Sequence, residues 1–344
     1  MIKRLHHLRP GTFSNLLSSL THLLFFGTDA HFKHYVAFRY ANPLTDHTLL
    51  QMKADGVTRA VAFSQYPQYS CTTTGSSLNH LWRELKRLNL SDTFKWSVID
   101  RWPVYTSFID AVVARIQLGL CQLFSGATSE ERAAATNVPA PPPSESLVSR
   151  LASPAAAGSV SASDLDRVLL LFSAHSLPMR VVNRGDPYPQ EVAATVPAVM
   201  HRLNAISEPL GYHHRYMLAW QSQVGPLPWL GPQTGEVIKQ LGAKGHKHVL
   251  VVPIAFTSDH IETLFEIDME YGRVAKEAGI THFHRSPSLN DEPIIFDALA
   301  QLVSQHLDAQ RAAESTQYRF DCPSCSNPMC RSIANPAHVW EKVA

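Results

Sequence analysis

Two short apolar runs, at residues 168–172 and 249–252, constrain the fold of this chain more than any other feature. Neither run alternates apolar with polar residues, which is typical of strands buried on both faces of a parallel sheet. In open α/β sheets, ligands bind beyond the carboxyl ends of the strands. Titratable residues follow both runs: His175 after the first, and Asp259, His260, Glu262 and Glu266 after the second. We therefore expect these side chains to face one cleft.

Segments with strand and helix patterns alternate along the whole chain, which predicts an α/β fold with parallel sheets. The expected strands are 34–38, 57–63, 95–99, 168–172, 216–221, 248–252 and 280–283. The expected helices are 45–55, 76–88, 104–123, 189–207, 234–241, 258–278 and 293–313. Two successive α/β halves indicate two similar doubly wound domains.

A segment dominated by Ala, Pro and Ser, at 133–163, separates these halves. Such a composition buries too little apolar surface to offset the entropy lost on ordering. We expect a disordered insertion over 126–164.

The overall composition excludes several classes of protein. A chain of 344 residues can hold two ordinary domains or one large one, and 45% hydrophobic with 17% charged residues is typical of a globular protein. No run reaches the roughly 18 apolar residues of a membrane-spanning helix. The net charge is +1 and the basic residues form no stripe, so nucleic acid is not an expected partner.

The first 28 residues contain no acidic residue but include Lys3, Arg4 and Arg9. This composition is typical of an organellar transit peptide, and equally of an untargeted, disordered N-terminus.

The segment after the second apolar run carries Glu262, Glu266 and Glu270 at intervals of four residues. On a helix capped by Ser258 or Asp259, these carboxylates share one face and repel one another. The row is either a solvated acidic surface or a path for protons or divalent cations. A neutral imidazole opposite carboxylates suits proton removal beside a cation, although a single loop histidine such as His175 is more often structural.

Three cysteines lie within nine residues near the C-terminus, at Cys322, Cys325 and Cys330. The odd total of five, with Cys71 and Cys121, does not fit a secreted disulfide framework. The spacing C-x-x-C-x-x-x-x-C predicts a zinc site or an iron–sulfur cluster that needs a fourth ligand.

Long strings of the chain resemble the ferrochelatase family, the enzymes that insert iron into protoporphyrin. They include F-S-Q-Y-P-Q-Y-S-C-T-T-T-G-S-S-L-N, K-W-S-V-I-D-R-W-P, L-F-S-A-H-S-L-P-M-R-V-V-N-R-G-D-P-Y-P-Q-E-V, W-Q-S-Q-V-G-P-L-P-W-L-G-P-Q-T and V-P-I-A-F-T-S-D-H-I-E-T-L-F-E. The resemblance extends from about residue 34 to 306 and implies that protoporphyrin IX and ferrous iron are the substrates.

The resemblance also implies roles for individual residues. His175 matches the proton-accepting histidine, and Glu262 the carboxylate that faces it and handles a proton or the metal. A proton or metal path is implied for Asp259, His260, Glu266 and Glu270. Porphyrin-binding positions are implied for Arg39, Tyr40, Trp102, Trp229 and Phe256, with ordinary core packing as the alternative for the aromatic side chains.

The cysteine tail resembles that of ferrochelatases that hold a [2Fe-2S] cluster. The resemblance implies Cys71, Cys322, Cys325 and Cys330 as the four ligands, and leaves Cys121 as a buried free thiol. It further implies a homodimer associated peripherally with the matrix side of the inner mitochondrial membrane.

The expected organisation follows from these matches. Residues 1–30 match the family poorly, 31–125 form a first chelatase domain shortened at its N-terminal side, and 165–292 form the second. The final helix and cysteine tail, 293–344, pack on the first domain. Tyr105 and Gln301 stand where relatives often carry histidine and aspartate. The hypotheses are a ferrochelatase, an inactive relative that binds porphyrin or metal, and a metal-sensing scaffold.

Overall fold

The computed structural model describes residues 33–124, 165–210 and 212–336. Two predicted segments lie outside the described residues: the poorly matched N-terminus, 1–30, and the insertion, 126–164. The chain divides into two compact units. Unit 1 comprises the described residues of Met1–Trp102, Asn183–Tyr188 and Phe296–Ala344, and unit 2 those of Pro103–Val182 and Pro189–Ile295.

Unit 1 is built around a two-stranded parallel sheet, β1 (Arg59–Phe63) and β2 (Lys95–Ile99). Its helices are α2 (Thr45–Ala54), α3 (Thr74–Arg87), most of α12 (Pro293–Asp308) and the short η3 (Thr316–Arg319). Side chains from α2, α3 and β2 form its buried core, together with Tyr318 of η3. The tail of the chain is therefore part of this core.

Unit 2 contains a four-stranded parallel sheet in the order β4-β3-β5-β6. Its strands are β3 (Leu169–His175), β4 (Arg215–Gln221), β5 (His248–Pro253) and β6 (His282–Arg285). Its helices are α4 (Thr106–Phe124), α8 (Met179–Val182), α9 (Tyr188–Ser207), η1 (Glu208–Leu210), α10 (Thr234–Ala243), η2 (Glu262–Tyr271) and α11 (Gly272–Glu277). The predicted parallel α/β class is confirmed.

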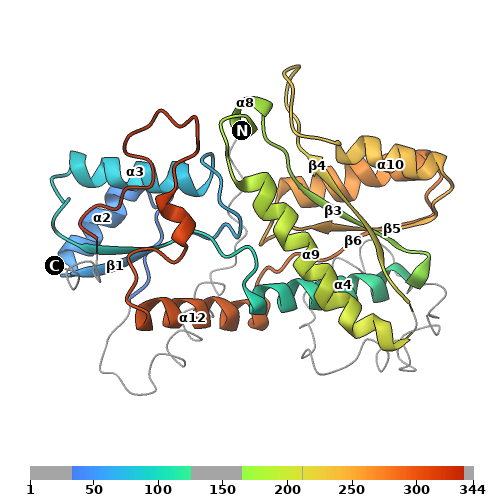
Figure 1. Cartoon of the computed structure of the whole chain (residues 1–344), viewed down its shortest axis with the longest axis horizontal. Helices are drawn as coiled ribbons and strands as arrows, with labels where there is room; N and C mark the ends of the chain where they lie inside the picture. Colours follow the sequence, from blue (N-terminus) through green and yellow to red (C-terminus); the bar gives the residue numbers. More distant parts are fainter. Residues whose placement is uncertain (1–32, 125–164, 211, 337–344) are drawn as a thin grey trace. The chain divides into compact units, whose positions relative to one another are not determined.

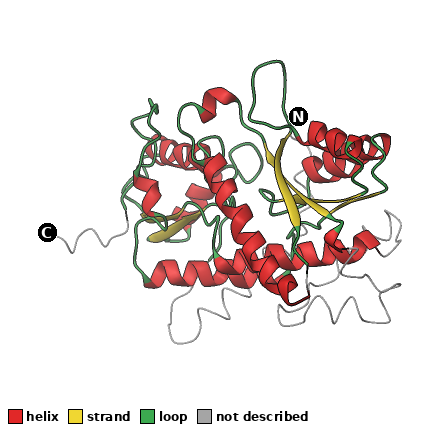
Figure 2. Cartoon of the chain, turned by 45° about the vertical axis from the view of Figure 1, so that its right-hand side comes forward, coloured by secondary structure: helices red, strands yellow, loops and turns green. Residues whose placement is uncertain are grey.

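Helices cover both faces of this sheet, with α10 on one side and α4 on the other (Figure 1). Figure 2 shows the same layering, with helices flanking the strands of unit 2. On the α10 side, Leu169 and Leu171 of β3 pack with Val237, Ile238 and buried side chains of η2 and α11. On the other side, Gly119 lets α4 approach β5, because an added Cβ would lie 3.1 Å from the Leu250 side chain.

The register of the sheet brings the ends of three strands together. His175 pairs with Gln221 at the end of β4, and Ser173 pairs with Pro253 at the end of β5. Strand β3 therefore extends three residues beyond the predicted end at 172. The reason is that Ser173 and Ala174, although small, are fully buried between neighbouring strands.

Other predicted boundaries are corrected by the structure. Residues 34–38 do not form a strand. In the described chain, β1 pairs with β2 alone, and within 34–38 only Phe38 makes a bridge, an isolated one to Leu44. Strand β6 begins two residues late, at His282. Helix α12 ends at Asp308 rather than 313, since the chain turns to bridge Ala313 to Val98 of β2.

The largest difference concerns the predicted helix 258–278. The helix begins only at Glu262 and is a π-helix through Tyr271, continuing as the α-helix α11. A π-helix has a wider turn than an α-helix and is frequently found at functional sites.

Helix α4 also differs in character from an exposed amphipathic helix. By length and apolar composition it is the one described helix that would satisfy the criteria for crossing a membrane. However, 72% of its most apolar 18-residue window is buried inside the protein. Its hydropathy therefore reflects its position against the sheet of unit 2.

The buried His214 makes the stability of unit 2 sensitive to acid. Neither ring nitrogen has a hydrogen-bond partner among the described residues, and the ring packs edge-on against Tyr212. Burial lowers the pKa of His214 to about 4. Because the unfolded chain binds a proton near pH 6.5 and the folded chain does not, stability is lost as pH falls from about 6.5 to about 4.

We predict that His214→Phe reduces the loss between pH 7.5 and pH 5 by about 2 kcal/mol. Urea unfolding at pH 7.5 and pH 5 measures it, and His213→Phe, at the exposed neighbouring position, is the matched control. Equal acid sensitivity in His214→Phe and the unmodified protein would contradict the prediction.

Candidate active site

A histidine and a glutamate meet at the carboxyl edge of the unit 2 sheet. His175 is the last residue of β3, and Glu262 is the first residue of η2. Nδ1 of His175 lies 2.8 Å from Oε2 of Glu262. Both side chains remain partly exposed, at 38% and 30%, so a bound molecule can reach them.

The charge on Glu262 sets the state of the imidazole. Burial alone would raise the pKa of Glu262, but the hydrogen bond with His175 and the nearby imidazoles hold it below its ordinary value. An ionised Glu262 accepts the Nδ1 hydrogen of His175. The other nitrogen, Nε2, then carries a lone pair and can act as a proton acceptor.

Glu266 lies one step further along η2 and is surrounded by donors. The backbone N–H of Ser222 and the hydroxyl of Tyr271 donate to Oε1, at 2.7 and 2.8 Å. The hydroxyl of Ser222 and the amide of Gln221 donate to Oε2, at 2.5 and 3.1 Å. The Ser222 oxygen also lies 3.2 Å from Oε2 of Glu262, so it joins the two carboxylates.

His260 is held in one tautomer beside this pair. Its Nδ1 accepts a hydrogen bond from the backbone N–H of Glu262 at 3.1 Å, so the ring proton resides on Nε2. Burial lowers the pKa of His260, although Glu262 and Asp259 oppose this effect. The ring of Phe256 packs edge-on against it, with centroids 4.6 Å apart. His260 is therefore neutral near pH 7.

The side chain of Asp259 braces the loop before η2. It accepts hydrogen bonds from Arg285, Ser288 and Asn290, at 2.7 to 2.8 Å. Burial opposes ionisation, but Arg285 and these donors hold the pKa of Asp259 below its ordinary value. The prediction that Ser258 or Asp259 caps the helix is wrong, because the N-cap position is Ile261. Asp259 instead ties the loop to the end of β6.

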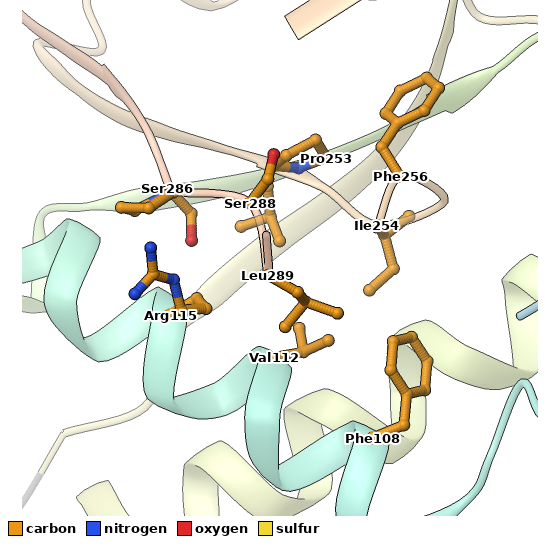
Figure 3. Close-up of a pocket in the computed structure, with 11 residues that line it drawn as sticks. Phe108, Val112, Arg115, Pro253, Ile254, Phe256, Ser286, Ser288 and Leu289 are labelled. Atoms are coloured by element: carbon orange, nitrogen blue, oxygen red, sulfur yellow. The ribbon is translucent and has the colours of Figure 1, made fainter. Parts of the chain in front are cut away.

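The remaining predicted residues of unit 2 differ in their surroundings. Trp229 lies beside His175, with ring centroids 6.4 Å apart and the rings nearly perpendicular. Glu270 is exposed on η2. Phe256 also lines a small cavity of about 20 Å³ between α4 and the loop after β6. Figure 3 shows Phe108, Val112 and Arg115 of α4 projecting into this cavity. It has room for about one water molecule, so it is no porphyrin pocket.

Three predicted porphyrin-binding residues belong to unit 1. Arg39 packs over the ring of the exposed Tyr40 and donates to the hydroxyl of Ser76. Trp102 is only 3% exposed, and its indole N–H donates to the carbonyl of Ser64 at 3.0 Å. The indole of Trp102 is therefore buried.

All four predicted cluster cysteines also belong to unit 1, as free thiols. Burial raises the pKa of Cys71 to about 12, and Asp186, Cys322 and Cys330 add to the rise. Asp186 anchors the Cys71 loop by accepting from its backbone N–H at 2.8 Å.

The four thiols share a neighbourhood but do not form a closed ligand set. A guanidinium N–H of Arg331 donates to the sulfur of Cys322 at 3.5 Å. In the described ranges, no three His, Cys, Asp or Glu side chains are gathered closely enough to hold a metal ion. The number and kind of donors fit a thiolate-bound cluster, since four cysteines are its usual ligands.

The sequence analysis missed the residues that hold the acidic row. Gln221 ends β4, the strand next to His175, Ser222 directly follows it, and Tyr271 ends η2. Gln221 could have been predicted, because a residue at the end of a strand adjacent to β3 shares the carboxyl edge of the sheet with His175. No local sequence pattern marks Ser222 or Tyr271 as residues of the site.

Comparison with known proteins identifies the family. The ferrochelatase family model matches residues 15–133 and 127–307. The mitochondrial ferrochelatase of Dictyostelium discoideum is 47% identical over 331 residues, which cover 93% of this chain and 71% of the relative. The human mitochondrial ferrochelatase is 46% identical over 300 residues, covering 87% of this chain and 60% of that protein.

A solved structure shows the same fold at low sequence identity. SirB from Bacillus subtilis, with Fe³⁺, matches with a TM-score of 0.53 and 11% identity, covering 93% of this chain and 95% of that chain. This likeness supports the chelatase-like α/β architecture alone. The family model and the identities to mitochondrial ferrochelatases show that this chain belongs to the ferrochelatase family.

Proposed function

We propose that this protein inserts ferrous iron into protoporphyrin IX to form protohaem, with His175 as proton acceptor and Glu262 as the carboxylate that receives the proton or meets the metal. The observation that carries the proposal is the 2.8 Å contact between these two side chains at the open edge of the sheet. Family membership supports the choice of reaction. The chain spans 60–71% of the length of the relatives described above, so the activity is a proposal for this chain.

The chemistry requires a base near the porphyrin nitrogens. Two pyrrole N–H protons must leave the macrocycle as Fe²⁺ enters it. Nε2 of His175 accepts one proton at a time, and the anionic Glu262 stabilises the imidazolium that forms. Each proton is then released to solvent from the partly exposed pair, so that His175 can accept the next. Binding energy from the rest of the macrocycle can be used to pucker it, which points a nitrogen lone pair toward the metal.

Aromatic and acidic neighbours complete the proposed site. The ring of Trp229 lies next to His175, and the ring of Phe256 packs edge-on against His260. We propose Arg39, Tyr40 and Trp102 as further porphyrin contacts on the basis of the family resemblance. The intact pair of His175 and Glu262 favours an enzyme over an inactive relative or a metal-sensing scaffold.

We propose the same resemblance-based role for the outer acidic residues. Asp259, His260, Glu266 and Glu270 would line a path for protons or metal. Of these, Glu270 is the exposed carboxylate, whereas Asp259 and Glu266 are held by several donors.

We also propose that Cys71, Cys322, Cys325 and Cys330 hold a [2Fe-2S] cluster. The proposal is supported by the four thiols that unit 1 brings into one neighbourhood. When bound, the cluster would supply a redox-active centre and a covalent link between the Cys71 loop and the tail.

The names of the relatives support a mitochondrial location, and the acid-poor start of the chain agrees with it. We propose the matrix side of the inner membrane, peripheral attachment and a homodimer from the family resemblance. Nucleic acid is not a proposed partner, since the net charge is +1.

The base assignment predicts that His175→Ala lowers kcat for iron insertion by about 10²- to 10⁴-fold, the usual contribution of a positioned general base. A stopped assay of protohaem formation measures it. His201→Ala, an exposed histidine on α9, is the control and should retain the rate of the unmodified protein. Absence of activity in the unmodified protein would contradict the proposed function, and full activity in His175→Ala would contradict the base assignment.

The cluster assignment predicts visible absorbance typical of a [2Fe-2S] centre in protein purified without oxygen. Cys325→Ser should abolish this absorbance, because it removes one of four thiolate ligands. Cys121→Ser, which removes the thiol outside the proposed set, should leave it intact. An identical spectrum in Cys325→Ser would rule out this ligand set.

A further inference from the structure

Ser222 has a backbone conformation that is rare for a serine. It directly follows β4 and has a φ of 65°, in the left-handed region that residues other than glycine seldom occupy. Such conformations persist where the surrounding structure enforces them, and they cluster at functional sites. At this position the chain has a serine whose backbone N–H and hydroxyl both donate to side chains of η2.

Ser222 donates two hydrogen bonds to Glu266, one from its backbone N–H and one from its hydroxyl. The hydroxyl also lies within hydrogen-bonding distance of Glu262, so its single hydrogen is shared between the two carboxylates. The backbone N–H lies 2.7 Å from Oε1 of Glu266, and the hydroxyl lies 2.5 Å from Oε2. The same hydroxyl oxygen lies 3.2 Å from Oε2 of Glu262, the oxygen that contacts His175. One side chain thus links the proposed reacting carboxylate to the next carboxylate of the row.

The environment of Glu266 differs from that of a cation ligand. Its two oxygens accept four hydrogen bonds, two from Ser222 and one each from Tyr271 and Gln221. An ionised carboxylate offers about four lone-pair positions. A metal ion could bind Glu266 only after these donors were displaced. In contrast, Oε1 of Glu262 receives no hydrogen bond from the described residues.

Gln221 reinforces the same arrangement from the strand. Its amide nitrogen donates to the backbone carbonyl of Glu262 at 2.9 Å, and its oxygen accepts from the buried hydroxyl of Ser173. The first turn of η2 is therefore fastened to the end of β4 through both main chain and side chains.

We propose that Ser222 is a positioning residue that holds Glu262 against His175 by tying it to Glu266, and that Glu266 is the anchor of this link rather than a cation ligand. The inference rests on the proposed function and narrows it: Glu266 would line the proposed path without binding the metal itself. The acidic row expected from the four-residue spacing then has two parts: Glu262 reacts, and Glu266 fixes its place.

Two substitutions remove the hydroxyl in different backbone settings. Ser222→Ala and Ser222→Gly both lose the link, while glycine also accepts the left-handed backbone. Each should lower kcat for iron insertion about tenfold, the size of one hydrogen bond to a charged group. The KM for porphyrin and the KM for Fe²⁺ should stay within about twofold in both variants. Ser222→Gly should melt no lower than the unmodified protein, which separates positioning from loss of folding.

A second measurement does not depend on activity. In protein labelled with ¹⁵N-histidine, the imidazole resonances of His175 are identified by their loss in His175→Ala. Ser222→Ala should shift the Nδ1 resonance, because Glu262 is no longer held by the link. Tyr271→Phe is the matched control: it also removes a hydroxyl donor from Glu266, but one with no contact to Glu262, so the resonance should keep its position.

Glu266→Gln distinguishes an anchor from a cation ligand. If Glu266 is an anchor, Glu266→Gln and Ser222→Ala disrupt the same link, and their effects on kcat should not add. The kcat of the double variant should then be no lower than that of the slower single variant. A raised KM for Fe²⁺ in Glu266→Gln with an unmoved His175 resonance would overturn the assignment. So would a wild-type His175 resonance in Ser222→Ala. If the unmodified protein inserts no iron, the proposed function fails, and the resonance still decides the role of Ser222.

Discussion

The candidate active site depends on the parallel pairing of β3 with β4 and β5. This register places His175 opposite Gln221 and Ser173 opposite Pro253, so that three strands end at nearly the same level. Every residue of β3 before His175 is buried, and a shift by one residue would turn its apolar side chains to the opposite face. The position of the proposed base is therefore determined by the core of unit 2 and not by a free loop.

Helix η2 is attached to that edge by two different kinds of contact. Ile267 is fully buried against the sheet, and the preceding residue, Glu266, binds the end of β4 through hydrogen bonds. Burying a side chain such as Ile267 is worth about 1.5–3 kcal/mol, and a hydrogen bond to a charged group adds a similar amount. Adjacent side chains of an α-helix point about 100° apart. A π-helix has more residues per turn, so adjacent side chains such as Glu266 and Ile267 point in more similar directions, and both contact the edge of the sheet. The outer side of the helix leaves Leu264, Phe265 and Met269 exposed.

Local pattern was sufficient to predict most elements but not the groups that hold the site. Strand β2 was predicted at its observed bounds, 95–99, and the two titratable segments were predicted to adjoin strand ends. Residues 34–38 have a strand-like composition, but composition does not supply a pairing partner, and they form no strand. The π-helix was predicted as an α-helix because the four-residue spacing of Glu262, Glu266 and Glu270 suits either geometry. Ser222 and Tyr271 were missed because their importance arises from contacts across 44 and 5 residues that no local pattern encodes.

The tail of unit 1 is held to β2 and to the core by backbone and side-chain contacts. The backbone N–H groups of Trp96 and Val98 donate to Asn335 and Ala312, so the tail adds bridges to β2 on both sides of η3. Tyr318, within η3, is 1% exposed in the core. These contacts lie on both sides of the cysteine segment, and the same unit places Cys322 and Cys330 near Cys71. A bound cluster would add its ligand bonds to these backbone and core contacts, and both would fasten the tail to the Cys71 loop.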